Sequence, residues 1–361
     1  MKVVVFGLTV SSSWGNGHAT LWRGLIRALG RRGCEVVFFE RDQPWYASHR
    51  DLHEIDGGRL ELYPDWAQVL PAARRAVREA DAALVTSYCP DAVAASRLIC
   101  DEARGAKVFY DMDTGVTLAR VQAGDRPDYL PPEGLGDFDL VLSYTGGEAL
   151  TLLRERLGAR RTAPLYGHVD PEVHRPAAPD PAFAADLSYI GTWAADRQAA
   201  LEALFVEPAR RRPAKRFVLA GSGYPQAFPW TENIWFVRHL PPGLHPAFFA
   251  ASRLTLNVTR ADMAAHGWCP SGRFFEAAAC GTPVLTDRWD GLEDFFEPGR
   301  ELLVADGSGD ALAALDLGDA ELAAIGAAAR ERTLQDHTSD RRADELLGLL
   351  SSTDARARAE A

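Results

Sequence analysis

Short apolar runs alternate with helical stretches along this chain, and that alternation restricts the fold more than any other feature of the sequence. In the first half, we expect buried strands at residues 3–8, 35–39, 82–86, 107–110 and 140–143. We expect helices at residues 18–32, 71–79, 92–102 and 148–157. Short continuous apolar strands separated by helices are typical of a parallel sheet covered on both faces. The first half is therefore predicted to be a Rossmann-like domain.

The same alternation begins again after a proline-rich passage. Strands are expected at residues 187–190, 217–220, 234–236, 254–258 and 284–286. Helical stretches are expected at residues 198–204, 246–251 and 308–350. A length of 361 residues also favours two domains over a single compact core. The predicted fold is thus α/β, with two tandem Rossmann-like, doubly wound parallel sheets that face a central cleft.

We place the domain boundaries in the proline-rich passage and near the end of the chain. The expected parts are an N-terminal domain at residues 1–168, a linker at 169–185, a C-terminal domain at 186–340, and a C-terminal helix and tail at 341–361. In folds of this type, ligands bind outside the carboxyl ends of the strands. The informative residues should therefore lie in the loops that follow strands.

Charge and hydropathy exclude several classes of protein. The net charge of −11 disfavours nucleic-acid binding, because that binding relies on clustered lysine and arginine. No apolar run reaches the length of a membrane span, and the apolar start of the chain is too short for a signal peptide. The five cysteines form no CxxC pair and no zinc-type cluster. We expect a cytoplasmic protein with reduced thiols and no membrane span.

The segment at residues 260–287 is predicted to form a loop, a short helix, a turn and a buried strand. Ser271 is expected to be the helix N-cap, Gly281 to end the helix, and Pro283 to open the strand. A helix start presents N–H groups and the positive end of the helix dipole to an anion. The element is therefore suited to bind a diphosphate.

Side chains on this helix strengthen that interpretation. Gly272 and Arg273 lie at the helix start, where a guanidinium offers two parallel donors to phosphate oxygens. Glu276 lies about one turn further in, and its carboxylate can accept from both hydroxyls of a ribose. The alternative is a structural helix that packs through its apolar face, with Glu276 solvated. We assign Ser271, Gly272, Arg273 and Glu276 to donor binding.

The first loop ends in Gly17 and His18, at the start of the first expected helix. Glycine lets a backbone approach a ligand closely, and His18 would lie at the helix N-terminus. A dinucleotide fingerprint requires glycine where this chain has Thr20, so NAD binding is disfavoured. The imidazole of His18 can act as a base or donate to a sugar, although a capping or surface role is more common for a lone histidine.

Asp111 and Asp113 directly follow the strand expected at residues 107–110. Two carboxylates at a strand end can share a divalent metal or position a hydroxyl nucleophile. They can also simply cap the next helix. Because short acidic pairs are common, we predict no metal site, and we keep Asp111 and Asp113 with His18 as catalytic candidates.

Two loops of the second half carry further candidates. Gly191 and Thr192 follow one expected strand, with Arg197 shortly after, and Gly221 follows the next strand. Backbone amides and an arginine in these places can meet a nucleotide. Arg197 can equally pair with a nearby carboxylate on the surface. We assign all four, together with Gly17, to donor binding.

Residues 275–284, FEAAACGTPV, resemble the donor-site signature of GT-B glycosyltransferases, in the form found in spore-maturation CgeB-like proteins. Supporting fragments follow in the family's order at residues 17–18, 111–114, 167–171, 191–193, 256–260, 337–338 and 341–342. The resemblance implies an acceptor bound mostly by the first domain and a nucleotide sugar bound by the second. It also implies that Glu276 binds the donor ribose, that Arg273 lies near the diphosphate and that His18 approaches the transferred sugar.

The chain departs from the family's pattern at one position. Many retaining members carry another glutamate eight positions before the ribose-binding one, in contact with sugar hydroxyls, and that position here is Trp268. We therefore keep Trp268, Asp262 and His266 as candidate sugar contacts. The donor hexose and the anomeric outcome stay open.

The sequence is interpreted as a metal-independent glycosyltransferase without a cofactor. It would move a sugar from a nucleoside diphosphate, by default UDP, to a hydroxyl or amine of a small-molecule or glycan acceptor. A helix start and an arginine can neutralise the leaving diphosphate. Two alternatives are a sugar-nucleotide epimerase of the same fold and a non-catalytic sugar-nucleotide-binding or assembly protein.

Overall fold

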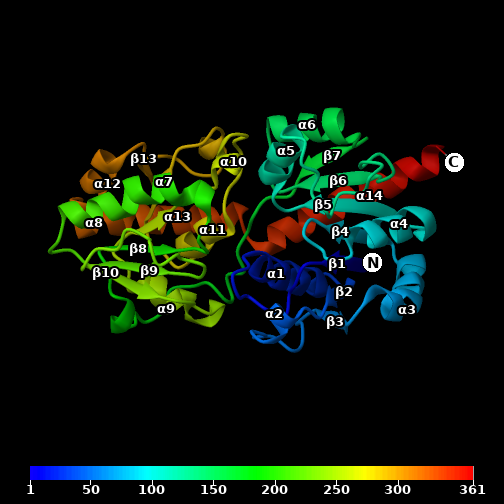
Figure 1. The fold of residues 1–361 in the computed structure, drawn as a ribbon, viewed down its shortest axis with the longest axis horizontal. Coiled ribbons are helices and arrows are strands. Elements are labelled where there is room, and N and C mark those ends of the chain that lie inside the picture. Colours follow the sequence, from blue (N-terminus) through cyan, green and yellow to red (C-terminus); the bar gives the residue numbers. More distant parts are fainter. Residues whose placement is uncertain (361) are drawn as a thin grey trace. The chain divides into compact units, whose positions relative to one another are not determined.

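The computed structural model describes the backbone of residues 1–360 and the side chains of residues 1–353. The chain forms two compact units. The first unit contains Met1–Ser13, Gly17–Tyr166 and the chain from Ser339 onward, and the second contains Trp14–Asn16 and Gly167–Thr338. Each unit is built on its own parallel sheet, which confirms the predicted pair of tandem α/β domains (Figure 1).

The sheet of the first unit has seven parallel strands in the order β3-β2-β1-β4-β5-β6-β7. They are β1 (Lys2–Gly7), β2 (Glu35–Arg41), β3 (Gly58–Tyr63), β4 (Ala82–Thr86), β5 (Ala106–Asp111), β6 (Leu140–Ser143) and β7 (Thr162–Pro164). The predicted strands are all present, but the edge strands β3 and β7 were not predicted. β3 is partly exposed over most of its length, so it lacks the continuous apolar run that marks a central strand.

Helices connect these strands. They are α1 (His18–Arg31), α2 (Pro44–Ala47), α3 (Trp66–Glu79), α4 (Ala92–Glu102), α5 (Thr114–Gln122), α6 (Glu148–Leu157) and α14 (Ser339–Glu360). The prediction that a helix starts at residue 71 was wrong, because Asp65 caps the helix by accepting the Gln68 N–H at 3.0 Å. Pro71 lies inside α3 instead of at its start.

The last helix, α14, packs against α1 in the first unit. Arg32, at the end of α1, pairs with Asp340 at 2.5 Å and with Asp344 at 2.6 Å. Residues 341–361 were predicted to form a separate C-terminal helix and tail. Over its described residues this segment instead belongs to the first unit, and residue 361 lies outside the described residues.

The sheet of the second unit has six parallel strands in the order β10-β9-β8-β11-β12-β13. They are β8 (Leu187–Ile190), β9 (Phe217–Ala220), β10 (Ile234–Val237), β11 (Thr255–Asn257), β12 (Val284–Asp287) and β13 (Leu303–Ala305). The five predicted strands are present. The edge strand β13 was not predicted, because three residues are too few for a period to be seen.

The helices of the second unit are mostly short, apart from α13 with 18 residues. They are α7 (Gln198–Leu201), α8 (Glu207–Arg211), α9 (His245–Ala250), α10 (Ala261–Ala264), α11 (Gly272–Ala279), α12 (Ser308–Leu315) and α13 (Asp319–Asp336). Single turns lie at η1 (Pro181–Phe183), η2 (Ala195–Arg197), η3 (Glu202–Val206), η4 (Pro242–Leu244) and η5 (Leu292–Asp294). The helical stretch predicted at residues 308–350 is therefore divided into α12, α13 and the first part of α14.

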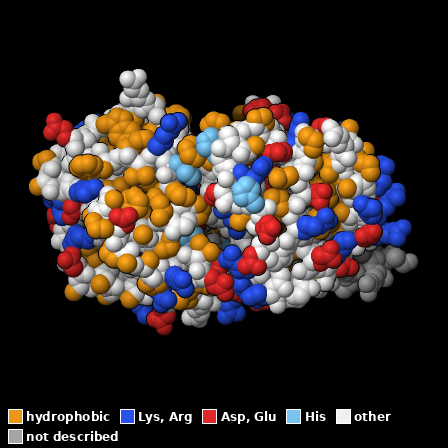
Figure 2. Space-filling model, turned by 90° about the horizontal axis from the view of Figure 1, so that it is seen from below, with side chains coloured by type: hydrophobic (Ala, Val, Ile, Leu, Met, Phe, Trp, Pro, Cys, Tyr) orange, Lys and Arg blue, Asp and Glu red, His pale blue; other side chains and the backbone are white. Residues whose placement is uncertain are grey.

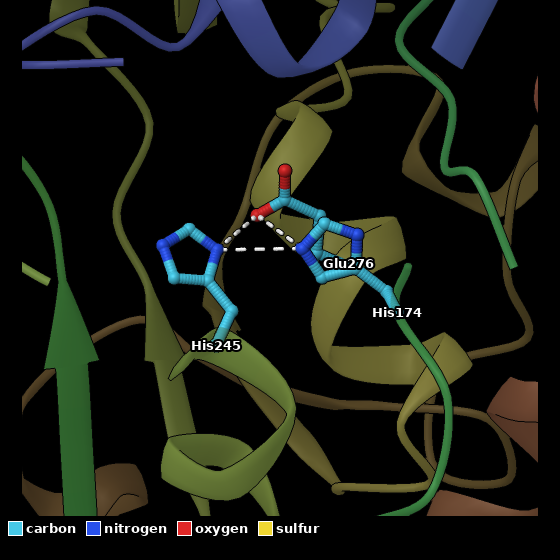
Figure 3. A group of neighbouring side chains, drawn as sticks. All are labelled: His174, His245 and Glu276. Carbon is cyan, nitrogen blue, oxygen red and sulfur yellow. Dashed lines mark hydrogen bonds and ion pairs between the residues drawn. The ribbon is translucent and has the colours of Figure 1, made fainter. Parts of the chain in front are cut away.

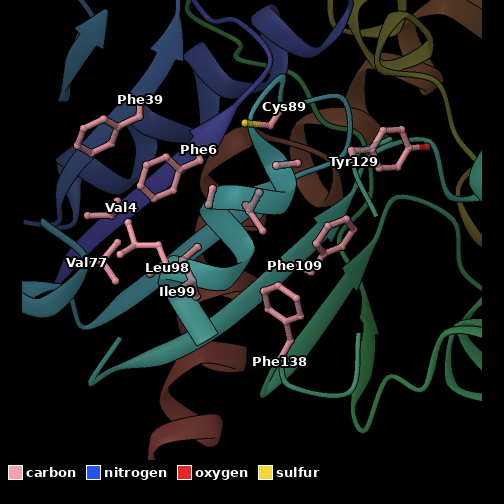
Figure 4. Close-up of a cluster of buried hydrophobic side chains, with 14 of the residues drawn as sticks. Val4, Phe6, Phe39, Val77, Cys89, Leu98, Ile99, Phe109, Tyr129 and Phe138 are labelled. Carbon is pink, nitrogen blue, oxygen red and sulfur yellow. The ribbon is translucent and has the colours of Figure 1, made fainter. Parts of the chain in front are cut away.

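Each unit has its own apolar core, which fixes where the loops leave the sheet. In the first unit, Phe6 and Phe39 stack with ring centroids 4.8 Å apart, and Phe109 and Phe138 meet edge to face at 5.6 Å (Figure 4). The second unit has a separate cluster that includes Phe205. Burial of such side chains is the main favourable term in folding.

The second unit exposes aromatic side chains along one edge of its sheet. Trp235 and Phe236 of the edge strand β10 are 56% and 43% exposed. The Arg216 guanidinium lies over the Trp235 ring, 4.6 Å from its centroid. Figure 2 shows hydrophobic side chains gathered over this unit. The edge thus exposes aromatic groups, one of them beneath an arginine.

Among the described helices, none combines the length and apolar character needed to cross a membrane. All five cysteines are free thiols, and four of them are buried. Burial raises the pKa of the Cys100 thiol to about 11, so it is protonated at neutral pH. The thiols are therefore packing residues.

Candidate functional site

A histidine and an aspartate meet at the carboxyl ends of the first sheet. Gly17 is the N-cap of α1 and His18 its first residue, while Asp113 lies two residues after the end of β5 and is the N-cap of α5. His18 Nε2 lies 3.1 Å from Asp113 Oδ2, and the two side chains are 16% and 20% exposed. A carboxylate in this position can orient the imidazole and hold its tautomer. The structure thus brings together two predicted catalytic residues that lie 95 positions apart.

Asp111 is placed differently from its neighbour. It ends β5, and its side chain is fully buried. Its Oδ1 accepts the Asp113 N–H at 3.1 Å, which holds the turn that presents Asp113. Burial raises the pKa of Asp111 to about 6, despite this hydrogen bond. Asp111 therefore positions Asp113 through a hydrogen bond to its backbone.

The loops after β8 and β9 touch backbone to backbone in the second unit. The Gly191 N–H donates to the Ala220 carbonyl at 2.8 Å. A Cβ on Gly221 would lie 1.9 Å from the Gly191 carbonyl oxygen, and Gly221 has a φ of +154°. Only glycine allows so close an approach. The two predicted glycines therefore pack the ends of neighbouring strands together.

Both predicted arginines contact the end of β8 or the loop that follows it. The Arg273 guanidinium donates to the Ile190 carbonyl at the end of β8. Arg197 Nη1 donates to the Thr192 carbonyl at 3.1 Å. An added Cβ on Gly191 would lie 3.0 Å from Arg273 Nη1. The structure thus groups five of the predicted donor-binding residues around the ends of β8 and β9, namely Gly191, Thr192, Arg197, Gly221 and Arg273.

The helix that carries Arg273 begins and ends as predicted. Ser271 is the N-cap of α11, Gly272 is its first residue, and Gly281 follows the C-cap with a φ of +81°. The Ser271 side chain makes no capping hydrogen bond. The first N–H groups of a helix have no partner within the helix, so a helix start without a side-chain cap suits an anion.

Glu276 points toward two histidines. Its Oε2 lies 3.4 Å from His245 Nδ1 and 3.8 Å from His174 Nε2, and the imidazole nitrogens are 3.3 Å apart. His245 is the first residue of α9, and His174 lies in the segment before β8. All three residues are buried. Figure 3 shows that the other carboxylate oxygen, Oε1, points away from the imidazoles.

Burial and charge act on this group in opposite directions. Burial alone would raise the pKa of Glu276, but the two neighbouring histidines outweigh it and lower the pKa to about 2. Burial lowers the pKa of His174 to about 4. At neutral pH the group therefore contains a carboxylate beside a neutral His174 imidazole.

Sequence reasoning missed both histidines of this group. His174 and His245 lie 71 positions apart and share no motif with each other or with Glu276. The sequence marks them only weakly. His174 lies in a loop between two prolines, and His245 precedes a proline at a helix start. Their proximity depends on how the segment before β8 and the start of α9 both pack against α11.

The comparisons with known proteins agree with this architecture. Residues 197–348 match the profile of a family described as "Glycosyl transferase-like". Sucrose-phosphate synthase from Thermosynechococcus elongatus is similar in structure, with 16% identity, a TM-score of 0.72, and coverage of 99% of this chain and 100% of that chain. No curated protein sequence matches this chain.

Two more solved structures are similar over nearly the whole chain. Anabaena Alr3699/HepE in complex with UDP and glucose has 13% identity and a TM-score of 0.70, with coverage of 98% of this chain and 100% of that chain. An α-glucosyltransferase in complex with UDP has 12% identity and a TM-score of 0.71, with coverage of 97% and 100%. This chain has the GT-B fold. The matched residues 197–348 include Arg273 and Glu276 but begin after Gly191.

Trp268 packs against the segment at residues 290–294. Its N–H donates to the Asp290 carbonyl at 2.7 Å, and its indole Nε1 donates to Asp294 Oδ2 at 2.6 Å. A Cβ on Gly291 would lie 2.3 Å from the indole ring. These contacts turn the ring toward residues 290–294. Its assignment as a sugar contact stays a prediction.

Proposed function

We propose that this protein is a glycosyltransferase that moves a sugar from a nucleoside-diphosphate donor, with a UDP-sugar as the default, to a hydroxyl or amine of an acceptor. The observation that carries the proposal is the placement of Arg273 at the start of α11, in contact with the end of β8, within the residues that match a glycosyltransferase-like family. The similar HepE and α-glucosyltransferase structures contain UDP, and both proteins also have structures with UDP-glucose. The proposal extends that donor class to this chain.

Donor binding is assigned to the second unit. The start of α11 and the guanidinium of Arg273 would bind the diphosphate, and Arg197 would add a second guanidinium from the loop after β8. Negative charge develops on the diphosphate as the sugar leaves, and fixed positive groups stabilise it. The transfer therefore requires no metal at the diphosphate.

The ribose is assigned to Glu276. Its Oε2 faces the histidines, while Oε1 points away from them and can accept from a ribose hydroxyl (Figure 3). The neighbours hold Oε2 in place, so the orientation of Oε1 is fixed before the nucleotide binds. Such preorganisation lowers the entropy cost of binding.

Acceptor activation is assigned to the first unit. Asp113 would orient His18, and His18 would remove the proton of the acceptor hydroxyl or amine as it attacks the sugar. Asp111 acts through Asp113 as a positioning residue. The net charge of −11 argues against a nucleic-acid acceptor, although one similar α-glucosyltransferase is in complex with DNA. We further propose that the chain groups with CgeB-like proteins, on the strength of residues 275–284.

A mixed-substrate screen tests this proposal. The purified protein is incubated with a panel of nucleotide sugars, with and without a panel of hydroxyl and amine acceptors, and products are identified by mass spectrometry. We expect a glycosylated acceptor and free nucleoside diphosphate, with both reduced by His18→Ala. A donor isomer formed without an acceptor would instead establish an epimerase. Binding without any conversion would establish a non-catalytic nucleotide-sugar-binding protein.

A further inference from the structure

Three atoms of the metal-binding type converge beside α11 in the second unit. The distances between His174 Nε2, His245 Nδ1 and Glu276 Oε2 are 3.3, 3.4 and 3.8 Å. All three residues are buried, and Figure 3 shows these atoms turned toward one another. A tetrahedral ion about 2.05 Å from its ligands holds them about 3.3 Å apart. Two sides of the observed triangle have that length, and the third is slightly longer.

The hydrogen bond on the far side of His245 determines which of its nitrogens can bind an ion. His245 Nε2 lies 3.2 Å from the Leu240 carbonyl oxygen. A carbonyl only accepts, so Nε2 donates a proton to it and Nδ1 is the ring nitrogen left to bind an ion. Nδ1 faces the Glu276 carboxylate. Histidines that bind metals are commonly held in this way, by a carbonyl on the other ring nitrogen.

We propose that His174, His245 and Glu276 form a binding site for a divalent cation of the zinc class. Two imidazole nitrogens and one carboxylate oxygen suit Zn²⁺, and a fourth position is left for water. The ion would join the segment before β8, the start of α9 and the middle of α11. It would be structural and would take no part in the transfer. This proposal departs from the sequence analysis, which predicted no metal site.

The ion also gives Glu276 a defined orientation. With Oε2 bound to the metal, Oε1 is the oxygen left to accept from a ribose hydroxyl. This role rests on the proposed function. The metal site itself does not, because it follows from the three ligand atoms and the Leu240 carbonyl.

Metal analysis tests the site without any substrate. The full-length protein is expressed with zinc in the medium, dialysed against metal-free buffer and analysed by inductively coupled plasma mass spectrometry. We expect about one zinc per chain in the wild type, and at least about tenfold less in His174→Gln and His245→Gln. The matched control is His53→Gln, because His53 is exposed and should keep the wild-type zinc content. Equal zinc content in all four proteins would overturn the proposal.

Cobalt substitution keeps the test decisive if the variants fail to fold. The wild type is stripped with a chelator and titrated with Co²⁺ alone, and visible absorption is recorded. A tetrahedral site with two histidines is expected to give intense visible bands that saturate at one equivalent and disappear when Zn²⁺ is added. The absence of such bands, with the stripped protein still folded by circular dichroism, would overturn the proposal.

The role in orienting Glu276 has a separate test. UDP is titrated into zinc-loaded and zinc-free wild-type protein by calorimetry. Weaker UDP binding by the zinc-free form is expected, since only the two histidines then hold Oε2 of Glu276. Equal UDP binding by the two forms would overturn the orienting role while leaving the metal site intact. Failure of both forms to bind UDP would instead count against the proposed function.

Discussion

Neutralising Asp111 should change the pH dependence of stability by an amount that the structure sets. The pKa of this buried carboxyl is about 6 in the folded chain, against an ordinary value of 3.8. The folded state therefore binds the proton more tightly than the unfolded state. The stability that the protonated group provides is complete below about pH 4 and is lost as the pH rises through about 6.

The size of the loss follows from the two pKa values. Their difference corresponds to about 3 kcal/mol, at about 1.4 kcal/mol for each pH unit. The unfolded chain ionises near pH 4, so about 1–2 kcal/mol of the total is lost between pH 5 and pH 8. Asp111→Asn does not ionise, and its side-chain oxygen can still accept the Asp113 N–H. The stability of Asp111→Asn relative to the wild type should therefore rise by about 1–2 kcal/mol from pH 5 to pH 8.

The assay must report the first unit separately from the second. Unfolding in urea at several pH values, followed by hydrogen–deuterium exchange mass spectrometry of the β4 and β5 peptides, gives the free energy of unfolding there. Asp101→Asn removes an exposed carboxylate of the same unit and serves as the control. The reasoning is refuted if Asp111→Asn and the wild type lose stability in parallel between pH 5 and pH 8.

Further predictions concern the two units separately. His18→Ala and Asp113→Asn should each lower kcat about 100-fold or more while UDP affinity stays at the wild-type value, and a loss of UDP affinity would move these residues to the donor. Gly221→Ala should weaken UDP binding measured by calorimetry, because its Cβ would collide with the Gly191 carbonyl. Gly243→Ala is the control, since its Cβ would point into open space and UDP binding should stay at the wild-type value. Equal UDP affinities of the two variants would contradict the role of Gly221. Phe109→Ala should lower the free energy of unfolding of the first unit by about 3–5 kcal/mol in urea titrations, and a loss below about 1 kcal/mol would contradict the core assignment.

Much of the fold could be predicted because its signals are local. Continuous apolar runs identify central parallel strands such as β4, and Ser271 and Gly281 mark the limits of α11 from their chemistry alone. The same reasoning placed His18 and Asp113 in loops at the carboxyl ends of strands. Their meeting at 3.1 Å follows from the sheet order, in which β1 and β5 both neighbour β4.

What could not be predicted depends on tertiary packing. The edge strands β3 and β13 lack a continuous run or enough residues to show a period. The pairing of His174 and His245 with Glu276 depends on three segments that are far apart in the chain. Trp268 shows the same limit, since its orientation is set by Asp294 and not by its neighbours in sequence.

Calorimetric titration of UDP tests the central claim most directly. The wild type should bind one UDP per chain. Arg273→Ala should bind it at least about tenfold more weakly, since a hydrogen bond to a charged group contributes about 1.5–3 kcal/mol. Arg210→Ala, which removes an arginine paired with Glu207 at 3.7 Å, should bind as the wild type does. The account is contradicted if the folded wild-type protein binds neither UDP nor any other nucleoside diphosphate.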